Sequence, residues 1–219
     1  MKHIHDPKAL KEVFEHPAYR KWFGDRFHAK ARVILFQPGE VLIGQGEEKN
    51  ALILLLEGRV SISAIMPNGK RRILKMESAP ALLGELEFLE MAPAAMTVCA
   101  LETCQAAWLP FSTCRRELVS DPDFLVKLGI LIGQKERQGA QRLFSTYSYP
   151  LENRLARFIL EMEENGRFLV RKVVAADSLG VSYRHLSEVL GDFVKKGYLR
   201  KEGLTYFIED YDSLGKLAP

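Results

Sequence analysis

The side chains best suited to chemistry lie on one short stretch near the C-terminal end of the sequence. Residues 182–188 read SYRHLSE, so consecutive positions carry a guanidinium, an imidazole, a carboxylate and several hydroxyl groups. Groups of these types hydrogen-bond to the base edges and phosphates of double-stranded DNA. The sequence offers no P-loop lysine, dinucleotide-binding glycine fingerprint, nucleophile elbow or metal-ligand pair. We therefore predict a binding surface and not an enzyme, with no catalytic residue and no metal site.

A helical hairpin is predicted to position this stretch. Ala175, Ala176 and Leu179 form an apolar stripe, Gly180 supplies a tight bend, and Ser182 suits the N-cap of a second helix. Apolar residues recur at helical spacing in that second helix, at Leu186, Val189, Leu190 and Phe193. Its polar side chains then share the opposite face, which can enter a DNA major groove. The alternative is an ordinary helical hairpin whose polar face is only solvated.

Each polar residue of this face suits a different part of DNA. Arg184 can donate two hydrogen bonds to guanine O6 and N7, and Glu188, one turn further on, can accept from a cytosine N4 amine. Tyr183 and His185 suit phosphates, thymine methyl groups or base edges. Ser182 can bring the free N–H groups of the helix N-terminus to a phosphate. The predicted DNA-binding set is completed by Ser187 and by four cations assigned to the DNA backbone: Lys195, Lys196, Arg200 and Lys201.

The distribution of charge favours this assignment. The whole chain has a net charge of +3, and residues 150–219 contain 11 basic and 11 acidic side chains. Within residues 171–201, however, seven basic side chains face only three acidic ones. The cations therefore gather at the candidate DNA element, as phosphate binding requires. Basic pairs such as Lys195 and Lys196 are also common on solvated surfaces.

The N-terminal half has a different texture. Between Ala31 and Pro110, short β-branched and leucine runs alternate with glycine turns, and Asn68-Gly69 is a strong hairpin signal between VSISAIM and KRRILKM. Many short strands at even spacing indicate a small antiparallel barrel or roll. The broken helical periodicity from Pro7 to Phe27 predicts one or two short flanking helices. Three nearby histidines have no metal-ligand spacing: His3, His5 and His16.

Several motifs in this half resemble the β-roll of cyclic-nucleotide-binding domains: Phe36-x-x-Gly39-Glu40, Gly46-Glu47, Leu56-Glu57-Gly58-Arg59-Val60, Asn68-Gly69 and Leu83-Gly84-Glu85-Leu86. Together with the helical hairpin, they make the sequence resemble the CRP/FNR family of bacterial transcription regulators over most of its length. The resemblance implies a homodimer that binds an inverted repeat in double-stranded DNA and contacts RNA polymerase. It also implies an α+β fold with an N-terminal antiparallel β-roll and flanking helices, a long dimerisation helix and a C-terminal winged helix-turn-helix.

The segment that binds the cyclic nucleotide in this family departs from the family pattern here. Glu85, within Gly84-Glu85-Leu86, matches the glutamate that contacts the ribose, although it can equally serve the short helix that it begins. The phosphate-binding arginine and its neighbouring hydroxyl fall on Ala94 and Ala95. A cyclic phosphate buried there would lack a cation, so we do not expect cyclic AMP as the ligand. Gly84, Glu85, Leu86, Ala94 and Ala95 remain the candidate effector pocket, and the effector stays unidentified.

The three cysteines raise a second hypothesis, a redox or iron–sulfur sensor of the same family. Relatives with a cluster carry its ligands in a cysteine-rich N-terminal segment, whereas this sequence has only Cys99, Cys104 and Cys114, one short of four thiolates. Cys99 and Cys104 flank a predicted turn and are expected near one another across a hairpin. Small buried apolar thiols are the favoured interpretation, so no cofactor is predicted.

The remaining segments complete a two-part organisation. Residues 1–120 are assigned to the β-roll domain, 121–149 to the dimerisation and linker helix, and 150–219 to the DNA-binding domain. The linker helix, from Asp121 to about Thr146, has an apolar stripe assigned to the dimer interface: Leu125, Leu128, Leu131 and Ile132. The alternative is that this stripe packs only on its own roll.

Beyond Tyr149-Pro150 the sequence predicts an amphipathic helix stopped by Asn165-Gly166, a strand at Phe168–Val170 and a two-stranded wing from Leu199 to Ile208. Tyr183 and Glu188 stand where the family has arginines, which puts the family's common operator in doubt. Neither a signal peptide nor a membrane-spanning run is expected, so we place the protein in the cytoplasm, with no membrane partner. A nucleotide-binding-like module that regulates another protein is the alternative that the predicted helix-turn-helix and wing disfavour.

Overall fold

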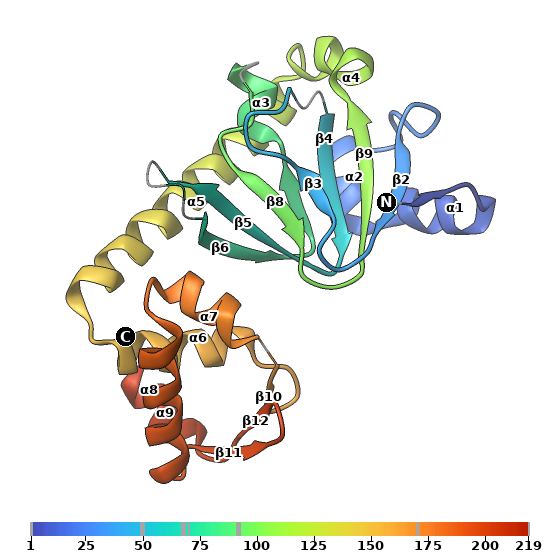
Figure 1. The fold of residues 1–219 in the computed structure, drawn as a ribbon. Helices are drawn as coiled ribbons and strands as arrows, with labels where there is room; N and C mark the ends of the chain where they lie inside the picture. Colours follow the sequence, from blue (N-terminus) through green and yellow to red (C-terminus); the bar gives the residue numbers. More distant parts are fainter. Residues whose placement is uncertain are drawn as a thin grey trace. The chain divides into compact units, whose positions relative to one another are not determined.

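The computed structural model describes residues 2–48, 51–66, 69, 71–90, 93–169 and 171–218, with the backbone alone for residues 90, 142 and 145–147 (Figure 1). The chain divides into two compact units, Met1–Gln134 and Lys135–Pro219. The division falls inside one long helix, α5 (Pro122–Ser148). Among the described residues, no helix is long and apolar enough to cross a membrane. The antiparallel sheets, the long helix and the C-terminal helix-turn-helix confirm the predicted fold class.

The first unit contains the β-roll. Its strands are β1 (Lys2–Ile4), β2 (Arg32–Phe36), β3 (Val41–Ile43), β4 (Ala51–Glu57), β5 (Arg59–Ile65), β6 (Arg71–Ser78), β7 (Ala81–Leu83), β8 (Thr97–Ala100) and β9 (Cys104–Pro110). They pair antiparallel in two sheets, with the orders β1-β2-β9-β4-β7 and β3-β8-β5-β6. The flanking helices are α1 (Pro7–Glu15), α2 (Pro17–Phe23), α3 (Glu85–Glu90) and α4 (Phe111–Leu118).

The hairpin predicted from Asn68-Gly69 joins β5 to β6. The two strands pair antiparallel from Arg59 opposite Ser78 to Ile65 opposite Arg71. Gly69 has a positive φ of 77°, which a tight turn requires and glycine adopts without strain. Asn68 itself lies outside the described residues. The prediction of a hairpin between these two strands is confirmed.

The strongly apolar β4 is buried on both faces. Its Ile53 and Leu55 belong to a core that takes residues from both sheets and therefore lies between them. Leu52 and Leu54 belong to a second core, which joins the outer face of the larger sheet to the helices. A strand covered on both faces loses the alternation of polar and apolar residues. This explains why the strand reads ALILLLE.

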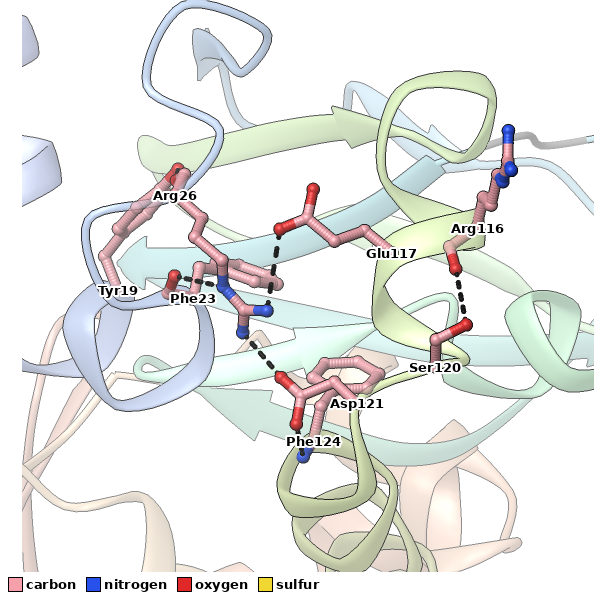
Figure 2. Close-up of polar contacts among 8 residues, drawn as sticks. All are labelled: Tyr19, Phe23, Arg26, Arg116, Glu117, Ser120, Asp121 and Phe124. Carbon is pink, nitrogen blue, oxygen red and sulfur yellow. Dashed lines mark hydrogen bonds and ion pairs between the residues drawn. The ribbon is translucent and has the colours of Figure 1, made fainter.

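One arginine ties the loop after α2 to the start of α5. Arg26 Nη2 lies 2.9 Å from Asp121 Oδ2 and its Nη1 lies 3.7 Å from Glu117 Oε1. Figure 2 shows both contacts as dashed lines. Arg26 Nε donates to the carbonyl oxygen of Phe23 at 3.1 Å. Asp121 Oδ1 also accepts the backbone N–H of Phe124 at 3.1 Å, so the same carboxylate caps α5. The start of the long helix is thus fixed to the roll unit by a cap and an ion pair.

The second unit is a winged helix-turn-helix. Its elements are α6 (Leu151–Met162), β10 (Arg167–Phe168), α7 (Lys172–Leu179), α8 (Tyr183–Lys195), β11 (Leu199–Glu202), β12 (Thr205–Ile208) and α9 (Tyr211–Leu217). The sheet has the order β10-β12-β11. Glu202 pairs with Thr205 across the turn between β11 and β12, which confirms the predicted wing.

Three details differ from the prediction. Helix α6 ends at Met162, because Asn165 and Gly166 form a separate tight turn at positive φ (52° and 76°) that leads into β10. The predicted strand at Phe168–Val170 is β10, which begins one residue earlier and ends at Phe168; Val170 lies outside the described residues. Helix α9 was not predicted, although Asp210 caps it by accepting the Ser213 N–H at 2.9 Å.

Candidate nucleic-acid interface

The turn between α7 and α8 is built by local backbone chemistry. Gly180 ends α7 in the left-handed conformation, with φ 68° and ψ 34°. The next N–H, of Val181, donates to the carbonyl oxygen of Ala176 at 3.0 Å. Ser182 Oγ then accepts the N–H of His185 at 3.2 Å and caps α8. The predicted bend and N-cap are both confirmed, because glycine tolerates positive φ and serine satisfies a free helical N–H.

The two faces of α8 separate as the spacing predicted. Leu186, Val189, Leu190 and Phe193 are at most 4% exposed and hold the helix on its unit. The opposite face is open to solvent, with Tyr183 54% exposed and the Arg184 side chain 89% exposed. His185 and Glu188 are exposed on the same side. This is the geometry that a helix needs to reach base edges in a major groove.

Ser187 is an exception to the predicted face. Its Oγ is buried and has no hydrogen-bond partner. The residue sits at the border of the helix, between the buried Leu186 and the exposed Glu188, so its short side chain stays against the unit. The hydroxyl is therefore not presented with the other polar groups, which corrects our placement of Ser187 on the solvated face.

Arg184 and Glu188 form an ion pair along the exposed face. Arg184 Nε donates to Glu188 Oε1 at 2.9 Å across one turn of α8. The contact uses only the Nε edge of the guanidinium, so both terminal nitrogens remain free of this contact and can donate to a guanine. The two candidate base-reading residues therefore contact one another in the free protein, whereas the prediction from the sequence assigned each of them a separate base.

The four cations assigned to the DNA backbone fall into two groups. Lys196 and Lys201 are exposed, and within the described part of the chain no carboxylate pairs with them. Lys195 lies 3.2 Å from Asp192 Oδ1 across less than one helical turn, at 80% side-chain exposure, so water and DNA still reach its ammonium group.

Arg200 differs from the other three cations. Its Nη1 contacts Glu202, its Nε donates to Glu209 Oε1 at 2.5 Å, and its guanidinium lies 4.7 Å from the centre of the Phe207 ring. Two carboxylates thus neutralise the charge that we assigned to a phosphate. The sequence could not reveal this, because Glu209 reaches Arg200 only through the pairing of β11 with β12.

Lys172 has no role in the DNA contact predicted from the sequence. Its charge is one of the seven basic charges of residues 171–201, but the residue lies outside the SYRHLSE stretch. In the structure its ammonium nitrogen lies 5.9 Å from the centre of the Tyr183 ring, at the start of α8. The only sequence signal for this contact was a basic residue at the start of the helix before α8, where Lys172 is the first residue of α7.

The candidate effector residues lie where β7 meets α3 and in the segment after α3. Gly84 has φ 81°, and a Cβ there would lie 2.7 Å from the carbonyl oxygen of Ala51. Glu85 is 9% exposed at the first position of α3, and Leu86 follows it half-buried. Ala94 is 2% exposed and belongs to the core between the two sheets, whereas Ala95 is exposed. Apolar side chains surround Ala94, and neither alanine can offer a charge to a phosphate.

The four residues assigned to the dimer interface do not share one open face. Leu128 is 1% exposed in the single chain and belongs to the core of the roll unit. Leu131 and Ile132 are partly buried against the same core, and Leu125 is 37% exposed. The larger open apolar side chains near this end of α5 are Val126 at 62% and Ile130 at 58% exposure. Most of the stripe therefore packs on the core of its own roll unit.

Two of the three cysteines lie on strands of different sheets. Cys99 lies in β8 and Cys104 in β9, and these strands belong to different sheets, so the predicted hairpin between the two residues is wrong. All three thiols are free, with Cys104 and Cys114 buried and Cys99 half-buried. Burial raises the pKa of the Cys104 thiol and raises that of Cys114 to about 12. Among the described residues, no three histidine, cysteine, aspartate or glutamate side chains gather as a metal site would require.

Comparisons with known proteins agree with this geometry. Residues 33–121 match the cyclic nucleotide-binding domain family and residues 153–217 match the Crp-like helix-turn-helix domain family. The chain is 32% identical over 201 residues to the regulatory protein YeiL of Escherichia coli O157:H7, covering 92% of each sequence. It is 21% identical to a CRP-like cAMP-activated global transcriptional regulator of Mycobacterium tuberculosis, over 84% of this chain and 86% of that one.

Solved structures share the fold. A transcriptional regulator of the CRP/FNR family from Thermus thermophilus superposes with a TM-score of 0.73 at 21% identity, over 85% of this chain and 97% of that chain. The first matched family covers the β-roll and the second covers the winged helix. These relatives are regulators and not enzymes. The chain belongs to the CRP/FNR family of transcription regulators and is a DNA-binding member of it.

Proposed function

We propose that this protein acts as a homodimer that binds an inverted repeat in promoter DNA and contacts RNA polymerase there. The observation that carries the proposal is the open face of α8, where Arg184 is 89% exposed on a helix whose opposite face is fully packed. In the proposed complex α8 lies in the major groove, with Arg184 on a guanine. Lys195, Lys196 and Lys201 lie near phosphates, as does the N-terminus of α8 at Ser182. Tyr183, His185 and Glu188 complete the contact.

The proposed dimer uses the open side of α5. Val126 and Ile130 lie one turn apart on this helix and expose more than half of their surface. Two apolar side chains at this spacing suit a helix that meets its own copy along a narrow seam. A dimer of this kind presents two copies of α8, so the half-sites of the repeat should lie about one helical turn of DNA apart.

We further propose that the roll does not use cyclic AMP. The Mycobacterium relative is named as cAMP-activated, but the resemblance of this sequence to the family assigns the positions of the phosphate-binding arginine and hydroxyl to Ala94 and Ala95. Ala94 is surrounded by the apolar core between the sheets. A cyclic phosphate at that place would lose its hydration without gaining a cation, which is costly. The residues present do not fit this ligand, and the proposal needs no bound metal or cofactor. Because its target is DNA, we place the protein in the cytoplasm.

A selection experiment tests the proposed function. The purified protein would be incubated with a randomised double-stranded DNA library, without added ligand, and the bound fraction sequenced. We expect an enriched inverted repeat with a guanine in each half-site. The matched control is the Arg184→Ala variant, which should lose preference at one position of each half-site. A wild-type protein that enriches no sequence, with and without cyclic AMP, would overturn the proposal.

A further inference from the structure

Lys172 contacts two aromatic rings from different elements of the DNA-binding unit. Its ammonium nitrogen lies 5.9 Å from the ring centre of Tyr183 and 5.5 Å from that of Tyr206. Lys172 is the first residue of α7, Tyr183 is the first residue of α8, and Tyr206 lies in β12 of the wing. One cation therefore joins the helix before the turn, the helix after it and the wing.

The two rings differ in how firmly they are held. Tyr206 is 4% exposed, its ring lies 6.5 Å from that of Phe168, and its backbone pairs with Lys201 across the wing. Tyr183 is 54% exposed at the open end of α8. The Tyr206 ring is thus held in one position by its packing, whereas the Tyr183 side chain has space to adopt several rotamers. The shared cation restricts that choice, because it is attracted to the face of each ring.

The ammonium group of Lys172 has no competing ion pair. Within the described residues it forms no ion pair or side-chain hydrogen bond, and it lies against the two rings. Arg184 and Lys195, in contrast, each pair with a carboxylate on α8. A cation held by ring faces keeps its full charge, so it can hold Tyr183 and still lie near the negative DNA backbone.

We propose that Lys172 is a positioning residue for DNA recognition, which holds the Tyr183 ring in the orientation that meets a base pair next to the one read by Arg184. This inference rests on the proposed function. An exposed tyrosine that is ordered before binding loses less conformational freedom when it meets DNA. Its preference for one base then becomes sharper, because the ring can no longer turn to accommodate the others.

The test compares base preferences in the randomised double-stranded DNA library. In the full-length protein, Lys172→Met should flatten the preference at the position next to the guanine read by Arg184 by about two- to fivefold. Lys172→Arg keeps a cation over the rings and should restore that preference. Tyr183→Leu should flatten the same position, and adding Lys172→Met to it should change the preference little further. Lys196→Ala is the matched control, since loss of a phosphate contact lowers binding to all sequences alike.

A readout in the free protein separates this inference from the proposed function. Protons that lie over aromatic rings resonate upfield, so the ε-CH2 protons of Lys172 should be shifted upfield, less so in Tyr183→Leu, and unchanged in Tyr206→Phe, which keeps its ring. If the wild-type protein enriches no DNA sequence, the proposed function fails. If it enriches a sequence and Lys172→Met shows the wild-type preference at every position, the positioning role is overturned. Random-coil ε-CH2 shifts in the folded wild type would overturn it as well.

Discussion

Arg184 and Glu188 form a hydrogen-bonded ion pair of 2.9 Å on the open face of α8, with side-chain exposures of 89% and 57%. The arginine precedes the glutamate, which is the less favourable order along a helix, and water screens both groups. Such a pair contributes only a few tenths of a kcal/mol to the stability of the helix. It can therefore orient the guanidinium in the free protein and rearrange at low cost when a base offers better partners.

The first prediction concerns base reading by Arg184. Arg184→Ala should remove preference for one base pair in each half-site, at a cost of about 1–3 kcal/mol per position, because a bidentate contact to guanine is lost. Competition binding with single-base variants of the selected site measures this loss. Arg157→Ala is a matched control, since Arg157 and Glu161 form the same type of pair, 2.8 Å long, on α6. An equal loss in both variants would contradict the groove assignment of Arg184.

The second prediction separates phosphate contacts from base contacts. Lys196→Ala should weaken binding to the selected site and to random DNA by the same factor. It should also reduce the slope of log affinity against log salt by about one, because one fewer counterion is released. Salt titrations of both DNAs measure the effect. Arg200→Ala should change the slope less than Lys196→Ala does, because Glu202 and Glu209 already neutralise that arginine. A larger change in slope for Arg200→Ala would show that the wing ion pairs open on DNA.

The third prediction distinguishes the two sides of α5. Ile130→Glu should convert the dimer to a monomer, because it places a charge on the proposed seam, and it should leave the roll folded because Ile130 is exposed. Leu128→Ala should leave the dimer intact and lower the free energy of unfolding of the roll unit by about 2–5 kcal/mol, since it opens a cavity in the core. Sedimentation and urea unfolding measure the two outcomes. A monomer from Leu128→Ala and a dimer from Ile130→Glu would contradict this division.

The fourth prediction concerns the acid sensitivity of the α5 cap in Figure 2. The hydrogen bond from the Phe124 N–H lowers the pKa of Asp121, and Arg26 lowers that pKa further. A carboxyl whose pKa is lower in the folded state stabilises that state above its unfolded pKa of about 4, and this contribution is lost as the pH falls through the folded pKa. Asp121→Asn should therefore lower the melting temperature near neutral pH and weaken the loss of stability below about pH 4.

Arg26→Met is the control for this cap, because it removes the arginine's contacts with Asp121, Glu117 and Phe23 and leaves the hydrogen bond from the Phe124 N–H to Asp121 in place. It should give an intermediate dependence of melting temperature on pH. If the wild-type and Asp121→Asn proteins lose stability in parallel between about pH 5 and pH 2, the carboxylate is not the group that responds.

The fifth prediction tests the thiols. Because burial raises the pKa of Cys104 and raises that of Cys114 to about 12, neither forms much thiolate near neutral pH. We expect iodoacetamide at pH 8 to modify neither residue in the folded protein and both in urea, while the half-buried Cys99 reacts first. Mass spectrometry of peptides gives the order of modification. Rapid modification of Cys104 in the folded protein would favour the redox-sensor hypothesis.

The elements that the sequence predicted best are those with local causes. Gly180 and Ser182 specify their turn through a positive φ and a side-chain cap, and neither depends on distant residues. The orientation of α5 was predicted less well. Its apolar stripe was recognised, but whether Leu128 meets its own roll or a second copy depends on packing by residues far away in the sequence.

The candidate site shows the same division. The open face of α8 followed from its helical period, whereas the buried Ser187 hydroxyl and the neutralised Arg200 did not. Both depend on how α8 and the wing strands pack within the unit, which no short stretch of sequence contains. Lys172 was missed for the same reason, since its contacts join three elements.

The internal pairing of Arg184 bears on how the protein travels along DNA. In the proposed complex with sequences that lack the site, the weak pair with Glu188 offsets part of the attraction of the Arg184 guanidinium to phosphates. We expect binding to random DNA to depend mainly on the flanking lysines, because phosphate contacts are alike in any sequence and allow a protein to slide. At the correct site Arg184 would release Glu188 and bind a guanine. This change of partner would lengthen the residence time on the site without slowing the movement of the protein along other sequences.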